Sequence, residues 1–167
     1  MKNLIDKILI RKNNLENISE KIKNLSNTPQ LKKIFDSINS YSETSEIRLV
    51  GGCVRKILNN EEVDDIDLAT NLEPNEVSEV LMKNQIDYYE TGIKHGTITA
   101  IIDDKKFEIT SLREDVLTDG RHAQIKFSKD WRNDALRRDF TINSIYSDRE
   151  GNICLLYTSP SPRDSNL

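Results

Sequence analysis

The chain has 167 residues, enough for one domain with a single hydrophobic core. Its 24 Lys and Arg against 28 Asp and Glu give a net charge of −4, which excludes a histone-like basic coat and a polybasic membrane anchor. No apolar run approaches the roughly eighteen residues of a membrane span, and residues 1–10 lack the pattern of a signal peptide. Its two cysteines and two histidines have neither disulfide nor zinc-site spacing. These features predict a soluble, cytoplasmic protein without a membrane partner.

The first part of the chain has the periodicity of helices. Apolar residues recur at helical spacing over residues 15–25 and again over 31–38. The second run follows Thr28-Pro29, which is typical of an N-cap with proline in the first turn. We expect residues 1–45 to form a helical lead-in.

Strands and helices alternate through the rest of the chain. Residues 47–70 predict a strand, a break at Gly51-Gly52, a short helix and a second strand. Two β-branched runs around Asp103-Asp104 predict a hairpin, whereas the polar residues 114–124 predict a loop. The remaining predicted elements are a helix over 74–83, a helix that runs to 138 with Ser128 as its N-cap and Asp130 as the acid near its start, and a strand over 141–146.

Paired glycines, Gly51 and Gly52, end one predicted strand and open a helix. Glycines let the backbone approach a phosphate, the free N–H groups of the helix start point toward it, and Arg55 adds a charge one turn later. Taken alone, the motif is equally well interpreted as an ordinary turn beside an exposed arginine.

Two aspartates alternate with apolar residues in the second predicted strand. Asp65 and Asp67 point to one face of such a strand, and Ile66 and Leu68 point to the other. Adjacent carboxylates repel each other unless a cation neutralises them, and such oxygen ligands suit Mg²⁺ bridging to phosphates. The pattern favours a metal pair over a solvated acidic turn, the alternative that the nearby acidic residues leave open.

A local excess of positive charge follows over residues 121–138, where Lys and Arg outnumber the acids by four. Arginines suit phosphate, and Asp139 or Asn143 can hydrogen-bond a ribose or a base edge. Without the other motifs, a charged helix face followed by an apolar strand is the better interpretation.

Five motifs follow one another along the chain: 51–55, 65–70, 94–99, 107–110 and 137–143. In this order and spacing they resemble the class II tRNA nucleotidyltransferase and bacterial poly(A) polymerase family, and residues 119–123 resemble its CCA-adding branch. The resemblance implies an α+β fold over residues 46–153. This would be a nucleotidyltransferase (polymerase β-like) head with a small mixed sheet flanked by helices.

The resemblance also implies residue roles. Asp65 and Asp67 would hold the catalytic Mg²⁺ ions. Glu108 lies where the superfamily places a third catalytic carboxylate, although it could be only an acid at the hairpin edge.

The same comparison implies a nucleotide site. Gly52, Arg55 and Arg138 would contact the incoming nucleoside triphosphate, next to Gly51 in the glycine turn. Asp139 and Asn143 match the segment associated with the ribose, and Asp139 could instead hold Arg138 in place.

The implied activity is the addition of CMP and AMP, from CTP and ATP, to a tRNA 3′ end by an N-terminal catalytic fragment. Poly(A) polymerase and a CC- or A-adding enzyme are close alternatives. An alternative from another functional class is a fragment that binds a nucleotide or RNA without catalysis. No stable protein partner is predicted.

Residues 154–167 differ in amino-acid composition from the chain before them, because they contain no Lys and no Ile. Their sequence resembles the translation of a sequencing-library adapter. We therefore expect a non-native tail there, with an ordinary Ser/Pro-rich tail as the alternative.

Overall fold

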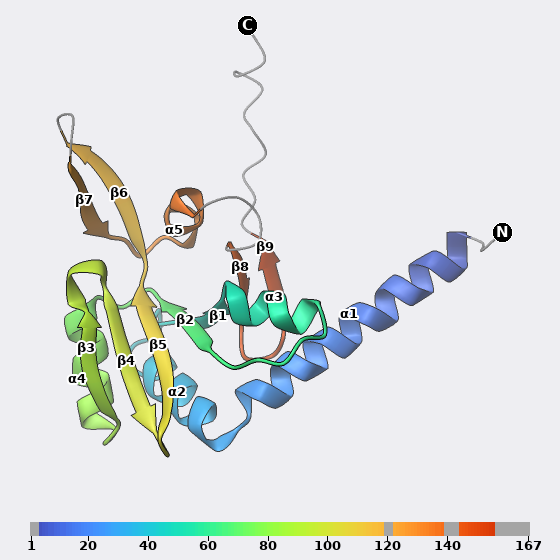
Figure 1. Cartoon of the computed structure of the whole chain (residues 1–167), viewed down its shortest axis with the longest axis horizontal. Helices are drawn as coiled ribbons and strands as arrows, with labels where there is room; N and C mark the ends of the chain where they lie inside the picture. The colour runs from blue at the N-terminus through green and yellow to red at the C-terminus, as the bar shows by residue number, and fades with distance from the viewer. Residues whose placement is uncertain (1–3, 119–121, 139–143, 156–167) are drawn as a thin grey trace, which may run out of the picture.

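The computed structural model describes residues 4–118, 122–138 and 144–155, with side chains for 13–116, 124–138 and 144–154. Within these residues the strands form a seven-stranded sheet, β3-β4-β5-β2-β1-β8-β9, and a ribbon of β6 and β7 (Figure 1). The helices are α1 (Leu4–Ser26), α2 (Pro29–Asn39), α3 (Gly52–Leu58), α4 (Pro74–Lys83) and α5 (Trp131–Arg137), with a short 3-10 turn at Ile93–His95. The strands are β1 (Ile47–Val50), β2 (Ile66–Thr70), β3 (Asp87–Gly92), β4 (Thr97–Ile102), β5 (Lys105–Ser111), β6 (Arg113–Thr118), β7 (His122–Phe127), β8 (Ile145–Ser147) and β9 (Ile153–Leu155).

The seven-stranded sheet is mixed: β2 runs parallel to β5, and all other neighbouring strands of the sheet are antiparallel. The parallel register places Asp67 opposite Glu108. The predicted α+β fold with a small mixed sheet and helices is thus confirmed.

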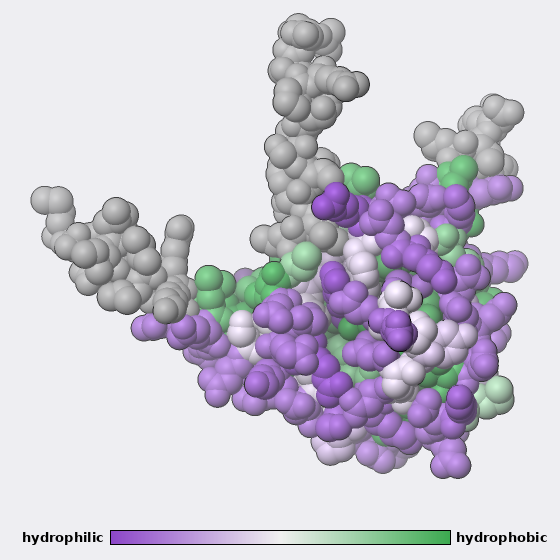
Figure 2. All heavy atoms as spheres, turned by 180° about the vertical axis from the view of Figure 1, so that it is seen from behind, coloured by the Kyte–Doolittle hydropathy of each residue, from purple (hydrophilic) through white to green (hydrophobic). Residues whose placement is uncertain are grey.

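The main hydrophobic core joins the sheet to helices α1–α4, and Ile22, Phe35 and Leu68 are fully buried in it. A smaller cluster contains Ala69 of β2 and Ala135 of α5. Leu68 and Ala69 are consecutive on a strand and point to opposite faces, so α5 covers the face opposite the main core. The helical lead-in and the head share one core, and the surface seen from behind is mainly hydrophilic (Figure 2).

Several local predictions hold in the structure. The β4–β5 hairpin pairs Ile102 with Lys105, and Asp103 and Asp104 have φ of +50° and +61°, as a tight two-residue turn requires. The predicted helix is present as α5, but its N-cap is Asp130 and not Ser128, because the Asp130 side chain accepts from the N–H of Arg132 at 2.8 Å.

Other predictions are wrong. Residues 114–124, predicted as a loop, contribute to the paired strands β6 and β7. This ribbon projects from the body (Figure 1), so its sequence lacks the alternation of a half-buried strand. The edge strand β3 escaped prediction for the same reason, since most of its side chains are exposed. Thr28 precedes α2 but does not cap it, because its hydroxyl donates to the carbonyl of Leu25 at 2.7 Å.

Strand β8 begins at Ile145, later than the predicted start at 141, and residues 139–143 lie outside the described part. Strand β9 was not predicted, and it crosses the expected boundary after Ile153 by continuing to Leu155. The helices of the described part include none long and apolar enough to cross a membrane.

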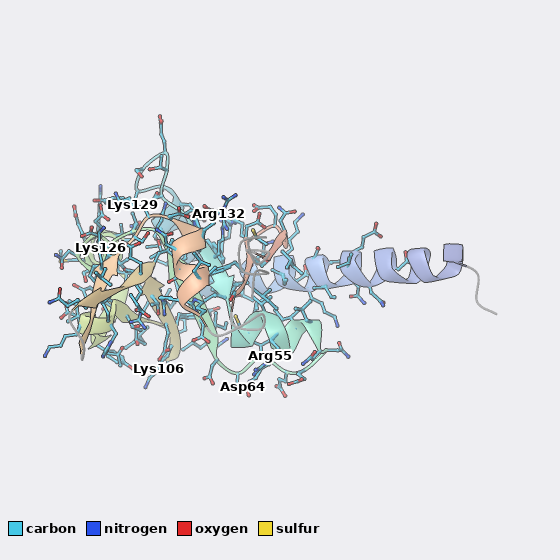
Figure 3. The ribbon with its side chains drawn as sticks, turned by 90° about the horizontal axis from the view of Figure 1, so that it is seen from above. Arg55, Asp64, Lys106, Lys126, Lys129 and Arg132 are labelled. Atoms are coloured by element: carbon cyan, nitrogen blue, oxygen red, sulfur yellow. The ribbon has the colours of Figure 1, made fainter. Side chains whose placement is uncertain are left out.

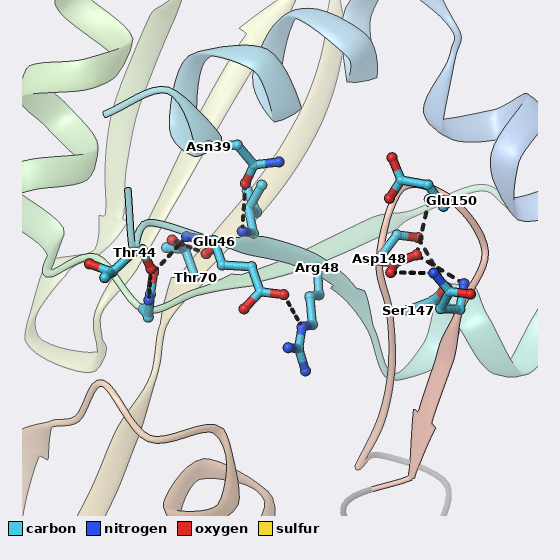
Figure 4. Close-up of polar contacts among 11 residues, drawn as sticks. Asn39, Thr44, Glu46, Arg48, Thr70, Ser147, Asp148 and Glu150 are labelled. Carbon is cyan, nitrogen blue, oxygen red and sulfur yellow. Dashed lines mark hydrogen bonds and ion pairs between the residues drawn. The ribbon is translucent and has the colours of Figure 1, made fainter. Parts of the chain in front are cut away.

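Two hydrogen bonds hold the start of β1 (Figure 4). The N–H of Ile47 donates to Asn39 Oδ1 at 3.1 Å. The Thr70 hydroxyl donates to the carbonyl of Glu46 at 2.8 Å. These bonds tie β1 both to the end of α2 and to β2, the strand that carries Asp67.

The turn between β8 and β9 is closed by Asp148, whose carboxylate accepts from the N–H groups of Glu150 and Asn152 at 3.0 and 2.9 Å (Figure 4). Gly151 in this turn has φ of +83°, and a Cβ added there would lie 2.3 Å from the carbonyl oxygen of Ser19 in α1. The Ser19 hydroxyl donates to the carbonyl of Gly151 at 2.9 Å. The turn therefore docks on α1 through backbone contact that requires glycine.

Candidate active site

Strand β1 passes into α3 through the glycine turn. Gly51 has φ +68° and ψ −125°, a conformation open to glycine and strained for other residues. The N–H of Arg55 donates to the carbonyl of Gly51 at 3.0 Å and closes the first turn of α3. A Cβ on Gly52 would lie 3.9 Å from Asp67 Oδ2. The turn therefore brings the backbone at the start of α3 beside the Asp67 carboxylate.

A first cavity, of about 470 Å³, opens beside this turn and is lined by the turn itself, by Asp67 and by three arginines. Arg113 comes from the start of β6, and Arg137 and Arg138 come from the end of α5. Other polar lining residues are His95, Thr97 and Thr110. Three guanidinium groups beside an open glycine turn suit an anion with several oxygens, such as a triphosphate.

The arginines of the first cavity are organised by Asp134, which is fully buried. Its Oδ1 accepts from Arg137 Nε and Nη2 at 3.0 and 2.8 Å, and its Oδ2 accepts from Arg138 Nε at 2.8 Å. The Tyr146 hydroxyl at 2.7 Å and the backbone N–H of Arg113 at 3.2 Å donate to the same carboxylate. Burial raises the pKa of Asp134, but the Arg138 charge, the tyrosine hydrogen bond and the Arg137 charge outweigh burial and lower it.

A second cavity, of about 340 Å³, lies on the other side of Asp67 and is lined by all three predicted carboxylates, Asp65, Asp67 and Glu108. Its lining also contains Tyr89 of β3, which is 38% exposed, and Lys106 of β5. The Lys106 ammonium lies 5.8 Å from the centre of the Tyr89 ring. Asp67 lines both cavities and so stands at their junction.

Asp67 feels the charges of the two carboxylates beside it. Burial raises the pKa of Asp67, and the negative charges of Glu108 and Asp65 raise it further. A cation placed among them would relieve this repulsion. No three acidic, histidine or cysteine side chains in the described part are placed to hold a metal ion by themselves. Mg²⁺ is commonly held by one or two carboxylates together with substrate phosphates, and the donor set fits that arrangement.

The structure brings most of the predicted site residues together, but not Arg55. Asp67 lines the first cavity with Gly51, Gly52 and Arg138. Arg55 is exposed on α3 and lines neither cavity. The predicted residues Asp139 and Asn143 fall outside the described part of the chain.

The predicted basic segment, residues 121–138, divides in space. Its last two members, Arg137 and Arg138, line the first cavity. Lys126, Lys129 and Arg132 are exposed, do not line it, and lie on the opposite side of the view from Arg55 and Asp64 (Figure 3). Cys53 of α3 is buried, and burial raises the pKa of its thiol.

Sequence reasoning missed Asp134 and Arg113. A local signal existed for Asp134, because an acid three and four residues before two arginines in a helix predicts ion pairs with them. No local signal marks Arg113, whose side chain enters the cavity only because β6 leaves the sheet at that point.

Residues 47–157 match the family model described as the poly A polymerase head domain. The chain belongs to this family. The expected resemblance is therefore confirmed, and the head domain covers the glycine turn, the carboxylates and the cluster around Asp134.

Relatives of this poly A polymerase head domain include CCA-adding enzymes. The chain is 46% identical over 112 residues to human mitochondrial CCA tRNA nucleotidyltransferase 1, a match that covers 66% of this chain and 26% of that protein. It is 39% identical over 110 residues to the CCA-adding enzyme of Lactobacillus johnsonii, covering 65% and 27%. The chain thus spans about a quarter of the length of these relatives.

Solved structures share the fold of this head domain. The CCA-adding enzyme of Bacillus stearothermophilus in complex with CTP superimposes with a TM-score of 0.65 at 26% identity, covering 78% of this chain and 30% of that one. A tRNA nucleotidyltransferase complexed with a primer tRNA and an incoming ATP analog has a TM-score of 0.51 at 24% identity, covering 66% and 31%, and shows the fold alone.

Proposed function

We propose that this chain is the catalytic head of an RNA nucleotidyltransferase that adds CMP and AMP, from CTP and ATP, to a tRNA 3′ end. The observation that carries the proposal is the position of Asp67, which lines an arginine-rich cavity on one side and a carboxylate-rich cavity on the other. The reaction needs such a junction, because an RNA 3′-hydroxyl attacks the α-phosphorus of the nucleotide and pyrophosphate leaves. The CCA-adding relatives support this choice of substrates.

The first cavity is the proposed triphosphate site. Arg113, Arg137 and Arg138 would offset the charge of the triphosphate and of the leaving pyrophosphate. The backbone at Gly51 and Gly52 would approach the phosphates closely, because neither residue has a side chain in the way. Of the predicted nucleotide ligands, Arg55 fits this role least, since it does not line the cavity.

Asp65 and Asp67 are the proposed ligands of magnesium, with Glu108 as the third catalytic carboxylate. When bound, Mg²⁺ would supply a Lewis acid that activates the hydroxyl and stabilises the leaving group. Burial and the charges of Glu108 and Asp65 raise the pKa of Asp67, and a bound cation would offset these effects. Glu108 lies opposite Asp67 in the sheet and would orient the attacking hydroxyl.

The second cavity is the proposed site of the RNA 3′ end. The half-exposed ring of Tyr89 offers a surface on which the terminal base can stack. Lys106 stands beside the ring and would contact the RNA phosphate. The attacking hydroxyl would then reach Asp65 and Glu108 from the side opposite the triphosphate.

The test is incorporation of labelled AMP and CMP into a tRNA that lacks its 3′ CCA, by a full-length version of the protein. Asp65→Asn and Asp67→Asn should each abolish incorporation. Asp64→Asn is the matched control, because Asp64 is an exposed neighbour that pairs with Lys56 at 3.1 Å and lines neither cavity. Near-parental incorporation by either test variant would refute the metal assignment.

The name of the matched family model keeps poly(A) polymerase as a second candidate, and a CC- or A-adding enzyme as a third. Sequencing the products formed with ATP, with CTP and with both separates the three activities. A non-catalytic binding fragment would show Mg²⁺-dependent stabilisation by ATP without turnover. The cytoplasmic location and the lack of a stable protein partner stay predictions.

A further inference from the structure

Asp134 has no direct access to a nucleotide, because it is fully buried beneath the first cavity. Each of its oxygens accepts from one arginine side chain and from one further donor: Oδ1 from Arg137 and the N–H of Arg113, Oδ2 from Arg138 and Tyr146. A carboxylate satisfied in this way is rigid, since four donor groups arrive from β6, α5 and β8.

Asp134 leaves nitrogens without a described partner on both guanidiniums that it binds, and both of these arginines line the first cavity. Arg138 binds through Nε, and its two terminal nitrogens make no hydrogen bond to any described residue. Arg137 uses Nε and Nη2, which leaves Nη1. Arg113 donates from Nη1 to the carbonyl of His95, while its Nε is buried without a described partner. Asp134 thus sets the directions of the Arg137 and Arg138 guanidiniums, whereas it bonds only the backbone N–H of Arg113.

We propose that Asp134 is the positioning residue of the triphosphate site: it holds the guanidiniums of Arg137 and Arg138 in the directions that bind the phosphate oxygens, and it fixes the backbone at Arg113. The inference rests on the proposed function for the identity of the anion. It assigns to Asp134 no contact with substrate, only control of the two guanidiniums that it binds.

Two effects of removing the Asp134 charge oppose each other. The cluster gains net positive charge, which alone would tighten anion binding. The arginines lose the acceptor that fixes them, so each must be ordered at the moment of binding. If Asp134 positions the arginines, the loss of order outweighs the gain in charge and binding becomes weaker. If Asp134 only balances charge, binding becomes tighter, so the sign of the change in affinity distinguishes the two roles.

The experiment measures binding of inorganic tripolyphosphate to the 167-residue chain by titration calorimetry, without Mg²⁺ and at fixed ionic strength. We expect Asp134→Asn to weaken binding about tenfold, the effect of losing one or two charge-assisted contacts. Tyr146→Phe is the partial variant, because it removes one of the four donor groups of Asp134 and leaves both arginine pairs, so it should weaken binding less than Asp134→Asn does. Its affinity should stay within about twofold of the parent, although both variants lower the melting temperature.

Asp134→Glu is the second test variant, used also if Asp134→Asn does not fold. It keeps the charge but moves the carboxylate by one methylene. Positioning therefore predicts weaker binding, whereas a simple charge balance predicts an unchanged affinity. Unchanged or tighter binding by the folded test variants overturns the inference, as does equal weakening by Tyr146→Phe or no binding by the parent chain. If the expected pattern appears but the full-length protein transfers no nucleotide, the proposed function fails and the positioning role stands.

Discussion

Asp67 and Glu108 are direct partners in the parallel register of β2 and β5. Two carboxylates of like charge therefore share one edge of the second cavity, with Asp65 beside them. The fold accepts this repulsion because the main core on the other side of β2, where Leu68 is fully buried, fixes the strand in place.

The first prediction concerns pH. The pKa of Asp67 is raised above its ordinary value of 3.8 in the folded chain, so the folded state binds this proton more tightly than the unfolded state. Stability from this group is present at low pH and is lost as pH rises from 3.8 through the raised pKa. Asp67→Asn should therefore melt at a higher temperature than the parent at pH 7, and the difference should vanish as pH falls to about 3.8.

Thermal melting of both chains from pH 3.5 to pH 8 measures this difference. Asp64→Asn serves as the control, because that exposed acid pairs with Lys56 and its loss removes an ion pair. An Asp67→Asn chain that melts at or below the parental temperature at pH 7 would contradict the assigned repulsion.

The second prediction separates the two glycines of the turn. Gly51→Ala places a Cβ at φ of +68° and should reduce the free energy of unfolding by about 1–2 kcal/mol. Gly52→Ala should not reduce it, because alanine suits a helix. Its methyl group would lie 3.9 Å from Asp67 Oδ2, in the path of a phosphate, and should lower nucleotide incorporation about tenfold or more.

Urea unfolding and single-turnover incorporation measure the two effects of these glycine variants separately. The interpretation of the turn fails if Gly52→Ala retains parental incorporation, or if Gly51→Ala is as stable as the parent.

The third prediction tests the RNA side. Tyr89→Ala should raise the KM for tRNA about tenfold, since base stacking on an aromatic ring is worth about 1–3 kcal/mol. The KM for ATP should not change, because Tyr89 does not line the first cavity. Tyr89→Phe keeps the ring and should behave as the parent. A rise in the KM for ATP alone would contradict the assignment, because it would mean that the Tyr89 ring contacts the nucleotide and not the RNA.

The fourth prediction concerns the turn that docks on α1. Gly151→Ala combines a φ of +83° with a Cβ 2.3 Å from the Ser19 carbonyl oxygen, and should cost about 3 kcal/mol. Gly92→Ala is the control, because its φ is −162° and its Cβ would meet Thr97 at 3.9 Å, an ordinary contact. Equal unfolding midpoints in urea for the two variants would show that the turn moves away from α1.

Local sequence was enough to predict the parts of the site that lie within one element. The alternation around Ile66 predicts that Asp65 and Asp67 share a face, and both line the second cavity. The glycine pair predicts the turn between β1 and α3, and Asp103-Asp104 predicts the β4–β5 hairpin. These features depend on backbone conformation and on the period of a strand, which neighbouring residues determine.

Only the tertiary structure decided which distant residues meet. The register of β2 against β5 places Glu108 opposite Asp67, and the departure of β6 from the sheet brings Arg113 to the arginines that Asp134 holds. The tertiary structure also leaves Arg55 outside the lining of the first cavity, although the family resemblance implied that Arg55 contacts the nucleotide. Such pairings follow from the burial of apolar faces contributed by segments far apart in the chain, and no local pattern records which faces will be buried together.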